Sequence, residues 1–143
     1  MASKKLVVHQ LAGKRFLAIN EAGDKVIIDG ENPAAGLRPM ELLLAALAGC
    51  TAYDVVDIMK KKRQPLQRYR IEVEGERAEE HPKRYTKISV THYGAGPEVT
   101  AEALARAAEL SHSKYCSVAA SLSAPIEVFT VVEPWEDEAQ ASS

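Results

Sequence analysis

The feature that most constrains the fold is a helical segment without a polar face. From Leu42 to Ala52 the expected helix is apolar on every side. A helix of this kind has to be enclosed, either inside a large core or between two subunits. A chain of 143 residues can hardly wrap such a helix by itself. The segment therefore predicts a homodimer.

Both ends of this helix are marked in the sequence. Pro39 suits the first helical position, and Glu41 places a negative charge in the first turn. Basic residues 60–63 suit the other end, and Pro65 prevents the helix from continuing. We interpret the basic run as a helix end rather than a contact with nucleic acid. The apolar run is also shorter than the roughly 20 residues of a membrane span.

Composition excludes several classes of protein. The net charge is −2 and charged residues make up 27% of the chain, which is typical of a soluble protein and gives no basic excess for a nucleic-acid partner. No apolar stretch follows the first five residues, so we expect no signal peptide and a cytoplasmic location. The length predicts a single domain over residues 1–133. Residues 134–143 are expected to form a flexible acidic tail.

Hydrophobic patterning predicts an α+β domain. Short apolar segments separated by glycine-containing turns indicate three strands before the helix. Two longer alternating strands then form a hairpin around residues 79–82, and a second helix starts near Thr100. A short helix over residues 114–121 and a strand over 126–132 complete the order βββ-α-ββ-α-α-β.

The two cysteines are too few for a disulfide scaffold but enough for one redox pair. Both could simply be small buried hydrophobic residues. Cys50, in the apolar helix, would need a cation from another element to become a nucleophile. Cys116 lies near the start of the short helix, where free amides favour a thiolate.

A metal site is the competing use of these residues. His112 and Cys116 are four residues apart and would share a helical face. The paired ligand spacings typical of zinc sites are missing, so we expect no metal. The other histidines, in strand or turn positions, are expected to be solvated (His9, His81 and His92).

Taken together, the two cysteine segments resemble the OsmC/Ohr family. The first is P-M-E-L-L-L-A-A-L-A-G-C, ending at Cys50, and the second is L-S-H-S-K-Y-C-S-V around Cys116. The resemblance extends to about Val132 and is greatest to a less characterised branch of the family. It implies an intertwined homodimer with two antiparallel sheets around long central helices.

The resemblance also implies a chemistry, which is thiol-dependent reduction of organic hydroperoxides. Cys50 would attack the peroxide oxygen and become a sulfenic acid, and Cys116 would condense with it to a disulfide. An external thiol or lipoyl-type reductant would then reset the pair, so no bound cofactor is expected. A second thiol nearby protects the first from overoxidation.

In the characterised branch of the family, an arginine from an early strand activates the first cysteine, and a glutamate ten residues before the cysteine holds that arginine. Met40 stands at that glutamate position here, and Glu41 is one place later. The arginine would fall near residues 14–15, which makes Arg15 the candidate, with Lys14 and Arg38 as other possible cations. Ser117 replaces the proline that commonly follows the second cysteine. Glu41 could equally be a first-turn helix charge, and Arg15 a surface strand residue.

Two other functions are compatible with the sequence. One is a non-catalytic dimer that binds a small hydrophobic ligand in an apolar cleft, which Met40 at the glutamate position would favour. The other is a redox sensor, in which the disulfide changes the affinity for a partner. The pKa values of the two thiols would distinguish chemistry from binding.

Overall fold

The computed structural model describes residues 2–136. They group into two compact units, one ending at Leu43 and the other beginning at Leu44. The prediction of one domain over residues 1–133 stays a prediction. Of the predicted acidic tail, residues 137–143 lie outside the described range.

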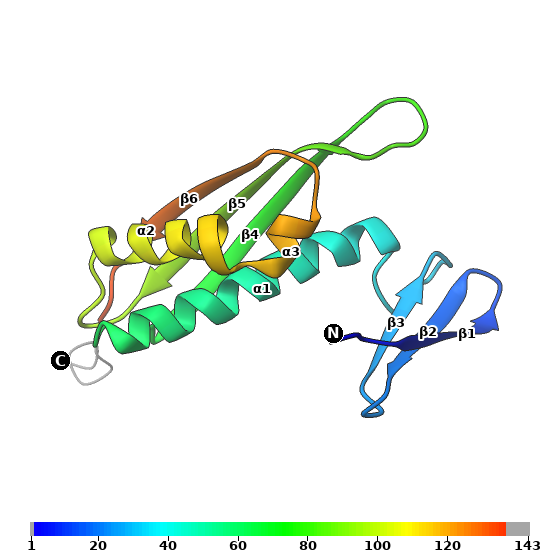
Figure 1. The fold of residues 1–143 in the computed structure, drawn as a ribbon, viewed down its shortest axis with the longest axis horizontal. Helices are drawn as coiled ribbons and strands as arrows, with labels where there is room; N and C mark the ends of the chain where they lie inside the picture. The colour runs from blue at the N-terminus through cyan, green and yellow to red at the C-terminus, as the bar shows by residue number, and fades with distance from the viewer. Residues whose placement is uncertain (1, 137–143) are drawn as a thin grey trace. The chain divides into compact units, whose positions relative to one another are not determined.

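The first unit is a three-stranded antiparallel sheet, as the sequence predicts (Figure 1). It consists of β1 (Leu6–Ala12), β2 (Arg15–Asn20) and β3 (Lys25–Asp29). The chain reverses at Gly13 and Gly23, whose φ angles of 56° and 91° are in the region that glycine adopts without strain. β1 is exposed along its whole length.

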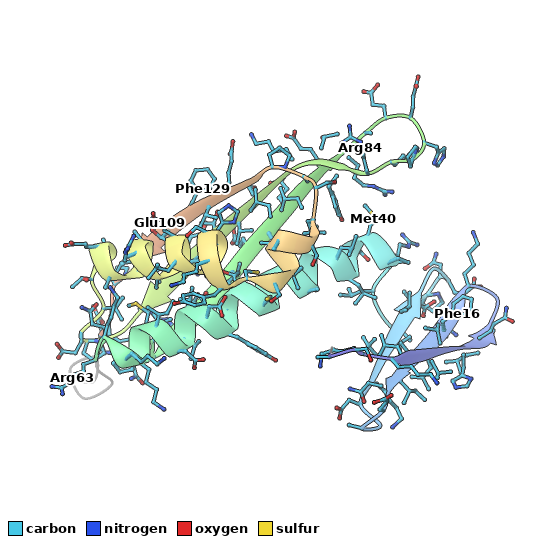
Figure 2. The ribbon with its side chains drawn as sticks, viewed as in Figure 1. Phe16, Met40, Arg63, Arg84, Glu109 and Phe129 are labelled. Carbon is cyan, nitrogen blue, oxygen red and sulfur yellow. The ribbon has the colours of Figure 1, made fainter. Side chains whose placement is uncertain are left out.

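The long helix α1 (Pro39–Lys61) begins at the predicted proline. Its buried residues recur every fourth position, which gives one buried stripe: Leu47, Thr51, Val55 and Met59. After the helix, Arg63 adopts a φ of 59°, and the Gln64 amide donates to the Met59 carbonyl over 2.9 Å. This left-handed residue ends the helix just before Pro65. Arg63 is labelled in Figure 2.

The second unit contains a sheet in the order β4-β5-β6. β4 (Arg68–Arg77) and β5 (Tyr85–Ala95) form the predicted antiparallel hairpin, whereas β6 (Ile126–Val132) pairs parallel to β5. The prediction that both sheets are antiparallel is therefore wrong for this one. The chain between β5 and β6 is long enough for the crossover that a parallel pair requires, and it contains the second and third helices.

Helix α2 (Ala101–Leu110) starts as predicted, because the Thr100 hydroxyl accepts a hydrogen bond from the Ala103 amide at 3.2 Å. It lies beside α1 along the second sheet (Figure 1). The main core of the unit is formed between the two helices and the sheet. Its buried members are Val55, Met59, Ala103, Leu104, Ala107 and Ala108.

Glu133, the last residue before the predicted tail, and the first two residues of the tail contact β4. Arg70 forms an ion pair with the Glu133 carboxylate, with 2.6 Å between the nitrogen and the oxygen. The guanidinium of Arg68 lies over the ring of Trp135, 5.4 Å from its centre. The carbonyl of Pro134 also accepts a hydrogen bond from Arg68. These contacts hold residues 133–135 against the outer face of the sheet.

Several apolar side chains of the second unit are exposed within the single chain. On α1, Tyr53 is 78% exposed and Val56 is 46% exposed, whereas the adjacent Val55 is fully buried. Phe129, labelled in Figure 2, projects from β6 and is half exposed. The chain thus covers only one side of its most apolar helix, as expected if a second subunit covers the rest. The intertwined homodimer itself stays a prediction.

By length and composition alone, α1 could also cross a membrane. The core helix of a soluble protein passes the same test, so this property is weak evidence. Leu47, Val55 and Met59 are buried in the second unit, so one side of the helix belongs to a protein core.

Candidate redox site

Helix α1 positions the first cysteine. Cys50 is half-buried and immediately precedes the buried Thr51. Its place beside the buried stripe, rather than on it, leaves part of the side chain accessible. Cys50 is a free thiol.

The second cysteine is at the junction between two short helical segments. A π-helical turn over Ser111–Tyr115 follows α2, and helix α3 spans Ser117–Ser121. Cys116 is the N-cap of α3, and its sulfur accepts a hydrogen bond from the Ala119 amide at 3.4 Å. Its side chain is buried, with 4% exposure. The predicted position near a helix start is confirmed.

The expectation that this position favours a thiolate is wrong. Burial first, and then the neighbouring Cys50 side chain, raise the pKa of Cys116 to about 11. The amides of Ala119 and Val118 act in the opposite direction, but α3 has only five residues and they do not outweigh burial. Cys116 is therefore a protonated thiol at neutral pH.

The structure brings the two cysteines together. The Cys50 side chain contributes to the raised pKa of Cys116, which requires the two thiols to lie close together. Both thiols are free, so they constitute a reduced pair of adjacent cysteines from α1 and the β5–β6 crossover.

A chain of hydrogen bonds fixes the turn before Cys116 to α1. The buried Ser111 hydroxyl donates to Asp54 Oδ2 at 2.7 Å and lies 2.8 Å from the Thr51 hydroxyl. The amide of Cys116 in turn donates to the Ser111 carbonyl at 2.7 Å. Sequence reasoning missed these three positioning residues, because contacts between residues 57 and 60 positions apart leave no periodic pattern.

His92 on β5 also lies at this site, and the prediction that it is solvated is wrong. It is fully buried, and its Nδ1 is 2.6 Å from the Tyr69 hydroxyl. Burial lowers the pKa of His92 to about 4, so the ring is neutral at physiological pH. Its alternation with Ile88 and Val90 could have indicated an inward side chain, because every second residue of a strand faces the same side.

A small cavity connects these residues. It has a volume of about 10 Å³ and is lined by residues of α1, the sheet and the crossover. The polar or ionisable members of the lining are Thr51, His92, His112 and Cys116. This volume is at the lower limit for one water molecule and is far too small for an organic ligand.

Arg15, the cation predicted to activate Cys50, has partners within the first unit. Its Nε donates to Asp29 at 2.7 Å, and its Nη2 donates to the Pro33 carbonyl at 2.9 Å. Asp29 also accepts from the amides of Glu31 and Ala35. The Ala35 amide first, and then Arg15, lower the pKa of Asp29 to about 2. Arg15 thus organises the loop after β3.

Glu41 has a structural contact as well. Its Oε1 accepts a hydrogen bond from the Arg38 amide at 2.9 Å, which satisfies a free donor at the start of α1. This matches the interpretation as a first-turn helix charge. A catalytic role for Glu41, and for Arg15, stays a prediction. Lys14 contributes its backbone amide to Glu31.

Within residues 2–136, no group of three or more potential ligands is placed to hold a metal ion.

Comparison with known proteins decides the family. The sequence model for the OsmC-like proteins matches residues 30–130, a segment that contains both cysteines. The chain belongs to the OsmC family. Members of this family are soluble proteins, in agreement with α1 as a core helix.

Among curated relatives of this OsmC protein is Protein YhfA of Escherichia coli K12. The two are 36% identical over 121 residues, which is 85% of this chain and 90% of YhfA. Among solved structures, a hypothetical protein from Aquifex aeolicus VF5 has a TM-score of 0.85 and 36% identity, over 96% of this chain and all of the other.

The organic hydroperoxide resistance protein OhrB of Bacillus subtilis shares the fold more distantly. Its TM-score is 0.60 at 16% identity, over 92% of this chain and 98% of OhrB. At this identity the likeness concerns the fold alone. The predicted OsmC/Ohr resemblance is thus confirmed.

Proposed function

We propose that this OsmC protein reduces organic hydroperoxides with Cys50 and Cys116 as a redox pair. The observation that carries the proposal is the proximity of a half-buried and a buried free thiol. The fold shared with a protein named for organic hydroperoxide resistance supports the same substrate class.

In the first step the sulfur of Cys50 attacks one oxygen of the hydroperoxide. An S–O bond forms and the O–O bond breaks, so that Cys50 becomes a sulfenic acid. The departing alkoxide takes up the thiol proton and leaves as an alcohol. The accessible part of Cys50 suits it to this role, because a peroxide has to reach the attacking sulfur.

In the second step Cys116 attacks the sulfur of the sulfenic acid. The S–S bond forms, the S–O bond breaks, and the hydroxide combines with the proton lost by Cys116 to give water. Burial of Cys116 suits this role, since a protonated, enclosed thiol resists direct oxidation. An external dithiol of the lipoyl type then reduces the disulfide by exchange.

The test measures cumene hydroperoxide consumption by the purified protein with dihydrolipoamide as the reductant. We expect turnover by the native chain and none by Cys50→Ser. Cys116→Ser should complete one oxidation and then accumulate sulfinic acid on Cys50, which mass spectrometry detects. Ser117→Ala, an exposed neighbour of Cys116, is the control and should retain turnover.

Two results would contradict the proposal. No peroxide consumption by the native chain would exclude peroxidase activity with this reductant. Disulfide formation without turnover would instead favour redox sensing. Binding of a hydrophobic ligand has less support here, because the cavity at Cys116 has room only for a water molecule.

A further inference from the structure

The second unit contains a buried imidazole with one nitrogen unused by the protein. His92 is fully buried, and Tyr69 engages its Nδ1. In the part of the chain that the structure describes, Nε2 has no hydrogen-bond partner. A buried polar atom without a partner is costly, so a partner other than protein is expected for it.

The contact with Tyr69 indicates which ring nitrogen carries the proton. The 2.6 Å distance is shorter than the usual 2.7–3.2 Å of an N–H donor to oxygen and fits a hydroxyl donor. Burial raises the pKa of Tyr69, so its phenol keeps the proton it needs to donate. Tyr69 therefore donates to Nδ1, and the neutral ring has its own proton on Nε2.

His92 and Cys116 line the same cavity. Since Nδ1 is occupied by Tyr69, Nε2 is the ring nitrogen left to face that space. The volume of about 10 Å³ suits one water, which needs two to four polar partners. Nε2–H, the Cys116 sulfur and the Thr51 hydroxyl supply three such groups.

We propose that His92 is a positioning residue for Cys116: its Nε2–H holds one water in the cavity, and this water donates a hydrogen bond to the Cys116 sulfur. This bond stabilises the thiolate relative to the thiol. Its use in disulfide formation rests on the proposed function. There the thiolate forms the S–S bond as hydroxide leaves Cys50, and the hydroxide takes up the proton that Cys116 released.

The test uses the Cys50→Ser chain, in which Cys116 is the only thiol. The rate of Cys116 alkylation by iodoacetamide, measured from pH 7 to 9, reports its thiolate fraction. Adding His92→Leu should lower the rate about tenfold at each pH, because one hydrogen bond to the charged sulfur is lost. His92→Gln, which can keep a donor near Nε2, should remain within about threefold of the parent.

Two controls separate this role from a general effect on folding. Ser113→Ala changes an exposed side chain of the turn before Cys116 that does not line the cavity, and it should have little effect. Tyr69→Phe keeps the aromatic ring of residue 69 but removes the hydroxyl that keeps the His92 proton on Nε2. The alkylation rate should therefore fall by about threefold. Circular dichroism checks that each variant is folded.

Equal rates for His92→Leu and His92→Gln would overturn the proposal, whether both fall or neither does. If His92→Leu does not fold, the Tyr69→Phe variant tests the proposal instead. An unchanged rate of Cys116 alkylation in Tyr69→Phe would then contradict the proposal. Since no peroxide is involved, the result is independent of whether the protein is a peroxidase.

Discussion

The Ser111 hydroxyl donates a 2.7 Å hydrogen bond to the Asp54 carboxylate and thereby ties the turn before Cys116 to the helix that carries Cys50. Thr51, the residue after Cys50, contacts the same hydroxyl. Three polar side chains thus hold two segments of the chain in register at the point where the thiols meet. This arrangement leads to the first prediction.

Ser111→Ala should lower the free energy of unfolding by about 1–3 kcal/mol, because the Thr51 hydroxyl and the Asp54 carboxylate both lose a partner. Urea denaturation measures the change. The matched control is Ser113→Ala, whose hydroxyl donates to the Glu109 carbonyl at the surface and whose loss should cost under about 0.5 kcal/mol. Equal costs for the two variants would show that the network does not stabilise the unit.

Asp29 should make the stability of the fold depend on pH in the acid range. Its pKa of about 2 is below the ordinary value of 3.8, so its carboxylate stabilises the folded state above pH 4. That contribution is lost as the pH falls from 4 towards 2. Asp29→Asn should therefore be less stable at pH 7 and lose less stability over this range, as unfolding curves at each pH would measure.

Arg15→Gln tests the cause of this low pKa. The titration midpoint of Asp29, followed by NMR, should rise but stay below 3.8, because the Ala35 amide still lowers it. Lys14→Gln is the control, since Lys14 contacts this loop through its backbone amide. A midpoint unchanged by Arg15→Gln would refute the role assigned to the ion pair.

Disulfide formation should accelerate with pH. The pKa of Cys116 is about 11, so the thiolate fraction rises roughly tenfold for each pH unit between 6 and 9. Mixing the reduced protein with one equivalent of hydroperoxide and counting the remaining thiols over time measures the rate of this step. A rate that levels off below pH 8 would mean that Cys116 does not limit it.

The exposed apolar side of α1 predicts self-association. The native chain should sediment at twice its 15.6 kDa, and Tyr53→Arg should shift the population towards the monomer. Asp57→Asn, a polar change at another exposed position of α1, provides the comparison and should leave the dimer intact. Sedimentation of the native chain as a monomer would contradict the predicted homodimer.

Local signals in the sequence predicted the elements well. Pro39 marks the start of α1, Thr100 caps α2, and β6 has the predicted bounds. These features depend on neighbouring residues. The direction of β6 depends instead on the path of the connection from β5. The helices in this connection could have indicated a parallel pair, because parallel strands need a crossover.

The candidate site was only partly predictable, for a related reason. The resemblance identified Cys50 and Cys116, and the structure places them close to each other. The groups that surround them come from distant parts of the chain, as with Ser111 and Asp54. His92 was expected to be solvated, although its strand alternation with Val90 could have indicated an inward side chain.

The parallel pairing of β5 and β6 has a consequence for the second thiol. If β6 were antiparallel to β5, a tight turn could join the two strands. No connecting segment would then have to run back along the sheet. The parallel direction requires that return, and the returning segment carries Cys116 to Cys50. The orientation of one strand thus creates the place that the second sulfur occupies.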